Sequence, residues 1–249
     1  IQLTTNTGQE IILDAGSGIR VMGKAVPVPE DNHYSLFFSH FHWDHICGLP
    51  FFDPAFREGV QIDVYSPFEK AEDFLALQMS AVQLFPVLWK DFSHNFKFHT
   101  IDTSENYFID GLNIRCCKMS HPGDSYAYSF VEDNKKVVYA TDVELLDLES
   151  LNKNEIEAVF KNADVVVLDT QYTMEELYEK ENWGHSAFCY AIDFAVSMNI
   201  KSVYLFHHEP TYDDKKINSI LDAAKWYSSY ISKNSVQVEL AVEGLDVEI

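Results

Sequence analysis

The chain has 249 residues, 47% of them hydrophobic, and its 18 lysines and arginines face 39 aspartates and glutamates, for a net charge of −21. A chain of this length and composition can bury a substantial core. The acidic excess opposes nonspecific attraction to a nucleic-acid backbone, so a long RNA or DNA is disfavoured as a partner. We expect no membrane segment and no signal peptide.

Strand and helix patterns alternate along the chain. Strands are predicted at 10–13 and 36–38, and further strands begin at Val60, Phe96, Leu112, Tyr126, Val137, Asp164 and Ser202. Helical patterns cover 69–80, 152–161, 187–198 and 213–227. The alternation predicts a mixed α/β class. No linker, low-complexity tract or internal repeat divides the chain, so a single catalytic domain over residues 1–249 is expected.

A dense group of metal-binding side chains follows the strand at 36–38. It reads His40-Phe41-His42-Trp43-Asp44-His45. His40 and His42 should face the same side of an extended segment, because side chains there repeat every two residues. Asp44 and His45 follow where the chain turns towards a helix, so they can face a second ion near the first.

The order of a strand followed by a candidate ligand recurs later in the chain. The candidates that directly follow apolar runs are His121, Asp142 and His207. Neutral imidazoles and carboxylates hold Zn²⁺ and similar first-row divalent ions. Because adjacent strand ends can converge at one edge of a sheet, the pattern predicts a two-metal hydrolytic site.

Residues 40–45 resemble the metallo-β-lactamase superfamily signature, His-x-His-x-Asp-His, without a substitution. The resemblance runs from Asp14 to His208 and implies a four-layer αββα sandwich that lacks a short N-terminal segment here. It also implies two divalent ions, with Zn²⁺ expected and Mn²⁺ or Fe²⁺ as alternatives. One ion would take His40, His42 and His121, the other Asp44, His45 and His207, and Asp142 would bridge them.

Some neighbouring residues are assigned other roles. His207 is preferred as the last ligand because it directly follows its strand, and His208 is then expected to contact substrate or a ligand. The resemblance implies that Asp14 supports the metal loop from behind. Cys47 is interpreted as a small hydrophobe, since the ligand set is complete without it. Solvated or core positions are predicted for His33, His94 and His99.

A second motif narrows the reaction. Asp169 ends the buried run 165–168, and Gly184-His185-Ser186-Ala187 precedes a helix. Both features resemble the phosphodiesterase branch of the superfamily, which includes ribonuclease Z. The resemblance implies that His185, oriented or charged by Asp169, stabilises the phosphate or protonates the leaving oxygen. The alternative is a helix-entry histidine bound by backbone. The predicted catalytic residues are Asp44, Asp142, Asp169 and His185.

Aromatic residues are expected to border the site: Trp43, Phe51, Phe52, Phe56, Tyr172 and Trp183. Their flat faces can stack on a base, which favours a small anionic substrate such as a cyclic or dinucleotide diester. Alternatively, several of them fill the core. Tyr172 and Trp183 are retained as candidate substrate-binding residues.

Several other predictions concern context. The four cysteines lack a Cys-x-x-Cys spacing, which favours reduced thiols in a cytoplasmic protein. The acidic segments 144–157 and 175–181 are interpreted as solvated faces. Analogy with the phosphodiesterase branch suggests a homodimer.

Competing functions remain open. A glyoxalase-II-like thioester hydrolase would use essentially the same ligands, and a metal-stabilised noncatalytic binding protein could retain them. A diiron reductase normally requires an attached flavin domain, and a β-lactam substrate is disfavoured by the Gly-His-Ser segment.

Overall fold

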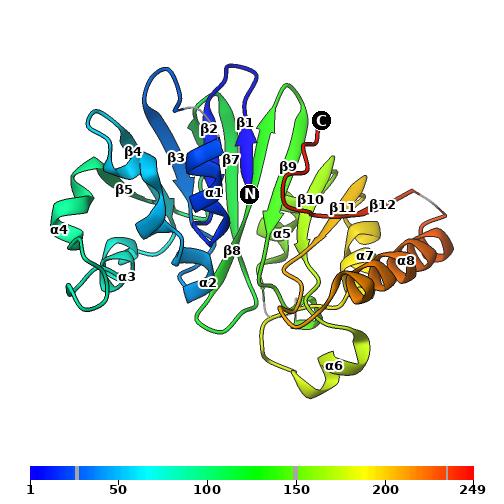
Figure 1. Ribbon diagram of the computed structural model, residues 1–249. Helices are drawn as coiled ribbons and strands as arrows, with labels where there is room; N and C mark the ends of the chain where they lie inside the picture. Colours follow the sequence, from blue (N-terminus) through cyan, green and yellow to red (C-terminus); the bar gives the residue numbers. More distant parts are fainter. Residues whose placement is uncertain (26–27, 148–150, 234) are drawn as a thin grey trace. The chain divides into compact units, whose positions relative to one another are not determined.

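The computed structural model describes residues 1–25, 28–147, 151–233 and 235–249. The chain divides into two compact units, Ile1–Asp102 (unit 1) and Thr103–Ile249 (unit 2). Each unit contains one β-sheet with helices connecting its strands (Figure 1), which confirms the mixed α/β class. The single-domain interpretation stays a prediction.

Unit 1 is built on a five-stranded sheet in the order β1-β2-β3-β4-β5. The first pair is antiparallel and the others are parallel. The strands are β1 (Gln2–Thr4), β2 (Glu10–Leu13), β3 (His33–Phe37), β4 (Gln61–Ser66) and β5 (Phe96–Thr100). Alternation along β3 and β4 places Leu36, Ile62 and Val64 in one apolar cluster, so this face of the sheet forms a core.

Short helices cover the core of unit 1. They are α1 (Gly18–Ala25), α2 (Trp43–Ile46), α3 (Ala71–Leu77) and α4 (Trp89–Phe92), with 3₁₀ turns η1 (Leu49–Phe51), η2 (Asp53–Phe56) and η3 (Ser93–Asn95). Helix α1 packs against η1 and η2 through buried Ile19 and Gly23. The helix predicted at 69–80 corresponds to α3, which is shorter than expected.

Unit 2 is built on a seven-stranded sheet in the order β12-β11-β10-β9-β8-β7-β6. Strands β6 to β9 pair antiparallel, and β9 to β12 pair parallel. The strands are β6 (Tyr107–Ile109), β7 (Leu112–Met119), β8 (Ser125–Glu132), β9 (Lys135–Ala140), β10 (Val165–Asp169), β11 (Ser202–Phe206) and β12 (Gln237–Leu240). Ala140 pairs with Leu168, and Leu168 with Leu205, so the carboxyl ends of β9, β10 and β11 lie side by side.

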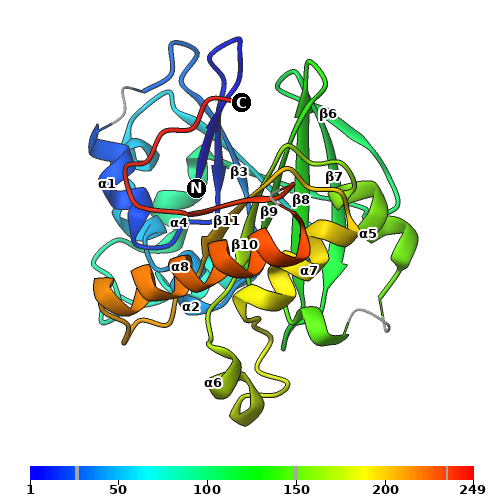
Figure 2. The same ribbon diagram turned by 90° about the vertical axis from the view of Figure 1, so that its right-hand side faces the viewer.

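The helices of unit 2 are α5 (Lys153–Phe160), α6 (Met174–Glu179), α7 (Phe188–Ser197) and α8 (Asp214–Ile231), with a 3₁₀ turn η4 (Leu145–Asp147). Helices α5, α7 and α8 pack on this sheet or on each other, whereas α6 projects from it (Figure 2). Helix α5 contacts β7 and β8, α7 contacts β10 and β11, and α8 contacts α7 and β12. The helices predicted at 152–161, 187–198 and 213–227 are confirmed, and α8 ends later than expected.

Side-chain caps explain two of these helix starts. The Asn152 side chain accepts from the backbone N–H of Asn154 at 3.1 Å. Asp213 Oδ1 accepts from the N–H of Lys216 at 2.7 Å. Each contact satisfies a backbone donor that the first helical turn leaves unpaired.

Three context predictions can be compared with the structure. All four cysteines are free thiols, as expected. Within the described ranges, no helix has both the length and the apolar character needed to cross a membrane. The prediction for residues 144–157 is wrong at Glu144, which is buried, while residues 148–150 lie outside the described part of the chain.

Helix α6 is tied to the start of α8 through Glu176. This carboxylate accepts from the Thr173 backbone N–H in a capping box, and it also accepts from the Tyr212 hydroxyl and from Lys216 Nζ. Burial opposes ionisation, but these hydrogen bonds outweigh it and lower the pKa of Glu176 to about 2.

We expect Glu176 to make stability depend on acid pH. Its folded pKa lies below the ordinary value of 4.5, so its stabilisation is complete above that value and is lost as pH falls towards about 2. Metal-free Glu176→Gln protein should therefore melt below wild type at pH 6, and the gap should narrow by pH 2.5. Glu175→Gln, on the exposed face of α6, is the control. A melting gap that does not change with pH would contradict the assignment.

Candidate active site

The histidine motif of unit 1 lies on the turn after β3 and on the short helix α2. The ring centroids of His40 and His42 are 4.6 Å apart, and those of His40 and His45 are 4.2 Å apart. Asp44 Oδ2 lies 3.2 Å from His45 Nε2. His40 and His45 are buried, whereas His42 and Asp44 are exposed. The predicted clustering of these four side chains within unit 1 is therefore present.

Asp14 holds this motif from behind. Its Oδ2 accepts from His45 Nδ1 at 2.9 Å and from the Ser39 hydroxyl at 2.6 Å, and its Oδ1 accepts from the Ser39 backbone N–H at 2.7 Å. Because the Ser39 hydroxyl donates to Asp14, the contact of 3.0 Å between Ser39 Oγ and His40 Nδ1 has the histidine as donor. In both imidazoles Nδ1 is therefore engaged from this side, and Nε2 is the nitrogen left to face away from Asp14 and Ser39.

The charge state of Asp14 follows from these contacts. Burial opposes ionisation, but hydrogen bonding and the charge of His45, together with His40 and Ser39, outweigh it, so the pKa of Asp14 lies below its ordinary value. An ionised carboxylate is the form that can accept from His45 and Ser39 together.

The loop after β2 and the loop after α2 are in close backbone contact. The N–H of Ala15 donates to the His45 carbonyl at 2.8 Å, and the N–H of Gly48 donates to the Ala15 carbonyl at 2.9 Å. A Cβ at Gly48 would lie 2.0 Å from the Gly16 carbonyl oxygen. Only glycine fits there, and the contact fixes the backbone that carries His45.

A second cluster lies at the strand ends of unit 2. Asp142 Oδ2 is 3.6 Å from His121 Nε2, and Asp142 Oδ1 is 3.2 Å from His207 Nε2. His121 Nδ1 donates to the Gly184 carbonyl at 2.9 Å, so Nε2 is the ring nitrogen that faces Asp142. Asp142, Asp169, His185 and His207 each offer a ligand atom, and these atoms all lie within 4.8 Å of one another.

Asp169 holds His185 at the end of β10. Its Oδ2 accepts from His185 Nδ1 at 2.7 Å, and its Oδ1 accepts from the N–H groups of Ser186 at 2.9 Å and Gln171 at 3.2 Å. Asp169 is fully buried. The His185 ring stacks on His207 with centroids 5.1 Å apart. The predicted pair of Asp169 and His185 is thus joined directly.

Three of the site residues have a left-handed backbone. The φ angles are 58° at Asp14, 51° at Asp142 and 58° at His207. This region is sparsely populated by residues other than glycine, and such residues gather where a site requires a particular side-chain direction. All three positions lie within two residues of the end of a strand.

The predicted substrate-binding residues differ in their burial and in their contacts. Tyr172 is buried, with its ring edge-on to His185 at 5.6 Å, whereas Trp183 is exposed. Lys180 Nζ lies 4.0 Å from the Tyr172 ring centroid and 5.6 Å from that of Trp183. His208 does not join the ligand cluster, and burial lowers its pKa.

The aromatic prediction needs a correction at Phe52. Its side chain is 0% exposed and packs edge-on against Tyr34 in the core of unit 1, because its position between η1 and η2 turns it inward. Trp43, Phe51 and Phe56 are exposed.

Other polar residues were interpreted correctly only in part. Cys47 is half-buried, and its Sγ donates to the Asp44 carbonyl at 3.9 Å, which agrees with a residue that is not a ligand. His94 and His99 are exposed, as predicted, and His33 is half-buried; the Nε2 atoms of His33 and His99 also contact opposite oxygens of Asp63 at 2.6 and 2.7 Å. The sequence gives no signal for these contacts, since His33, His99 and Asp63 come from three different strands.

Two residues contribute hydrogen bonds to the site but are not predicted from the sequence. Ser39 links Asp14 to His40, and Glu144 accepts from the N–H groups of Asn182 and Gly184. A serine directly between a strand and a ligand could have suggested the first. No local pattern marks the second.

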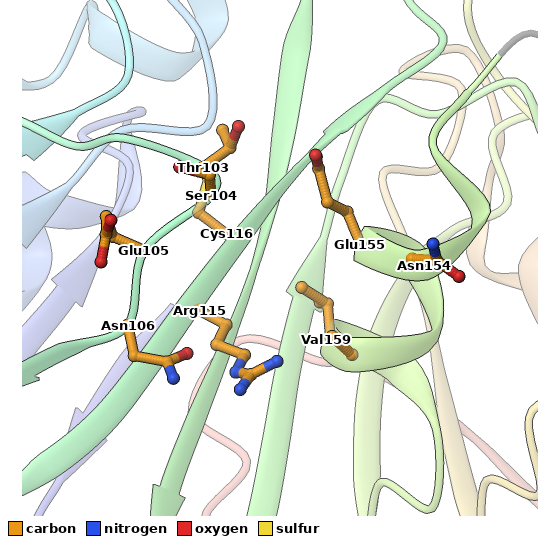
Figure 3. A pocket seen from close by; sticks show the side chains of 10 residues that line it. Thr103, Ser104, Glu105, Asn106, Arg115, Cys116, Asn154, Glu155 and Val159 are labelled. Atoms are coloured by element: carbon orange, nitrogen blue, oxygen red, sulfur yellow. The ribbon is translucent and has the colours of Figure 1, made fainter.

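Unit 2 also contains a cavity of about 170 Å³ away from these residues (Figure 3). It lies between the loop 103–106, β7 and α5, with Arg115, Cys116 and Glu155 among its lining residues. No predicted ligand lines it.

Comparisons with known proteins agree with these local arrangements. Residues 9–208 match the family model described as "Beta-lactamase superfamily domain". A ribonuclease Z of Picrophilus torridus is 22% identical, with 91% of this chain and 85% of the relative covered.

Solved structures give the same fold. The human tRNase Z short form has a TM-score of 0.70 at 17% identity, with 100% of this chain and 91% of that chain covered. Unliganded yeast PDE1 has a TM-score of 0.66 at 16% identity, with 84% and 67% covered. The chain therefore belongs to the beta-lactamase superfamily and has the metallo-β-lactamase fold.

Proposed function

We propose that this protein is a dinuclear metal-dependent phosphodiesterase that acts on a small phosphodiester such as a cyclic or dinucleotide. The observation that carries the proposal is the pair formed by Asp169 and His185, next to Asp142 and His207 at the strand ends of unit 2. The relatives named ribonuclease Z support phosphodiester chemistry as the class of reaction.

The donor set fits two divalent ions. Each unit contains imidazoles whose Nδ1 is bound by a neighbouring oxygen, so Nε2 is the nitrogen available for coordination at His40, His45 and His121. Following the superfamily motif, one ion would take His40, His42 and His121, and the other Asp44, His45 and His207, with Asp142 shared. When bound, the ions would acidify water and neutralise phosphoryl charge.

The residues of this chain supply the remaining steps. Asp169 fixes the Nδ1 proton of His185, so His185 Nε2 faces away from Asp169 and can hold a proton for a leaving oxygen. Tyr172 packs edge-on against the same ring and excludes water from one side of it. Asp14 and Ser39 orient His40 and His45 throughout.

The substrate size is argued from charge and from exposed aromatics. A net charge of −21 disfavours a long polyanion, whereas Trp183 and Trp43 are exposed on site-bearing segments and can stack on a base. RNA is the substrate class suggested by the names of the relatives. RNA is therefore the alternative substrate that is tested beside the small diesters. Zinc as the metal and a homodimer as the assembly stay predictions.

Thioester hydrolysis is the second candidate, because it uses essentially the same ligands. The hydrogen-bonded pair of Asp169 and His185 favours the phosphodiesterase, since a thiolate leaves readily without a proton donor.

The first test is hydrolysis of bis(p-nitrophenyl) phosphate by wild type and by Asp142→Ala, each reconstituted with Zn²⁺, Mn²⁺ or Fe²⁺. Asp142 contacts both His121 and His207, so its loss should lower kcat by at least about 10³ and lower the metal content. Asp246→Ala, on the exposed tail, is the control and should retain activity.

Each result has a clear reading. Wild-type turnover that Asp142→Ala loses supports the proposal and leads to a comparison of cyclic dinucleotides, mononucleotides and RNA. Metal-loaded wild type without phosphodiester turnover, but with thioester hydrolysis, would overturn it.

A further inference from the structure

Glu144 follows Asp142 by two residues, and its carboxylate contacts a distant loop. Oε1 accepts from the backbone N–H of Asn182 at 3.1 Å, and Oε2 accepts from that of Gly184 at 3.1 Å. The side chain is buried. In the described part of the chain, no lysine or arginine pairs with it. Burying a carboxylate is unfavourable unless hydrogen bonds compensate for the lost water. The two amide contacts provide this compensation, and they fix the position of the loop.

Gly184 passes this restraint to His121. The Gly184 carbonyl accepts from His121 Nδ1 at 2.9 Å. Gly184 has a φ of 84°, and a Cβ there would lie 2.1 Å from His121 Nδ1 and 2.5 Å from Pro122 Cδ. The backbone of this one residue therefore connects the Glu144 carboxylate to the ring of a candidate metal ligand.

The same loop leads directly into His185. Beyond Gly184, His185 binds Asp169, and the Ser186 hydroxyl donates to the Val143 carbonyl at 2.6 Å. The second half of the loop is thus held by Asp169 and by the backbone next to Asp142. Glu144 holds the first half, where Asn182 has a left-handed φ of 67°.

We propose that Glu144 is a positioning residue: by holding the amides of Asn182 and Gly184, it fixes the Gly184 carbonyl that orients His121 and the entry of the chain into His185. The inference rests on the proposed function, since that function gives His121 and His185 their roles. Glu144 itself reaches neither substrate nor metal.

Three substitutions separate the contacts. Glu144→Gln keeps the size but turns one acceptor into an NH₂ group that faces an N–H donor. Glu144→Asp keeps the charge but is shorter by one methylene, so it can hold only one of the two amides. Glu144→Ala removes both contacts. The expected order of effect is Asp smallest, then Gln and Ala. Glu239→Gln, which breaks only the surface pair with Lys225, is the matched control.

The main readouts use metal-free protein. In Glu144→Gln, the amides of Asn182 and Gly184 should exchange hydrogen at least about tenfold faster than in wild type. The ¹⁵N signals of His121 should shift from a pure Nδ1–H tautomer to a mixture. Zinc affinity should then fall by about 10- to 100-fold, the range found when a group that orients a ligand is removed. With substrate, kcat should fall while KM changes little, and Glu144→Asp should recover part of the loss.

The outcomes are distinct. If amide exchange and the His121 tautomer match wild type in Glu144→Gln, the proposal is wrong. If the variants fail to fold, amide exchange is measured in the wild-type protein instead. The proposal is then wrong if the amides of Asn182 and Gly184 exchange as fast as those of an unstructured peptide. If wild type hydrolyses no phosphodiester while both readouts change as expected, the proposed function fails and the positioning role stands.

Discussion

Asp169→Asn is expected to lower kcat by about 10²- to 10⁴-fold with little change in KM. The asparagine amide can place its NH₂ group against His185 Nδ1, which then cannot keep its proton there. The unprotonated nitrogen would face Asp169 and the proton would move to the other side of the ring. Steady-state kinetics of metal-loaded protein would measure the loss.

The choice of substrate shows which role His185 plays. p-Nitrophenolate leaves as a stable anion, whereas a nucleoside alkoxide needs a proton. If His185 is the proton donor, Asp169→Asn should harm cyclic-nucleotide hydrolysis far more than p-nitrophenyl ester hydrolysis. Equal losses on both substrates would instead indicate that His185 stabilises the phosphate.

Two controls isolate the effect of Asp169→Asn. Asp164 lies directly before the first residue of β10, and its carboxylate pairs with Lys201. Asp164→Asn removes this carboxylate, so it should lower stability and leave kcat unchanged. Because Asp169 and His185 act as a unit, the double variant with His185→Ala should be no slower than the slower single variant. Additive losses would contradict a shared role.

Gly48→Ala is expected to destabilise unit 1 by at least about 2 kcal/mol, since its Cβ would lie 2.0 Å from the Gly16 carbonyl oxygen and 2.8 Å from Ile19 Cγ2. Both loops must separate to make room, which also breaks the contact between Ala15 and the backbone of His45. The melting temperature should fall by roughly 4–8 °C. Metal affinity should fall as well, because His45 moves with its loop.

Gly18→Ala is the matched control for Gly48→Ala. A Cβ at Gly18 meets nothing within 4 Å, and the residue begins α1, where alanine is favoured over glycine. Its melting temperature should equal or exceed that of wild type. Calorimetry that gives the same stability for both variants would show that the two loops adapt without cost.

The sequence was most informative where chemistry coincides with the end of a strand. Asp142, Asp169 and His207 each end or follow an apolar run, and parallel pairing of β9, β10 and β11 puts these ends next to each other. A strand reveals its end locally through the change from apolar to polar residues. That is why these candidate residues could be chosen without a structure.

Contacts that depend on register could not be found in this way. Asp14 meets Ser39 only because β2 and β3 are adjacent and parallel, and nothing near either residue fixes that pairing. Glu144 shows the same limit, since it reads as part of an acidic surface segment until the loop at Asn182 is placed beside it. Helix α1 was missed because two of its eight residues are glycine, which lowers helix propensity.

The parallel register of β9, β10 and β11 also makes catalysis a reporter of folding. Side chains alternate between the faces of a strand, so a slip of one residue in β10 would turn Asp169 away from His185 and place Leu168 in its position. Partly folded chains with near-native secondary structure would then bind metal poorly and lack turnover. During refolding, activity should return only after the slow pairing of these distant strands is complete, later than the far-ultraviolet signal of the helices.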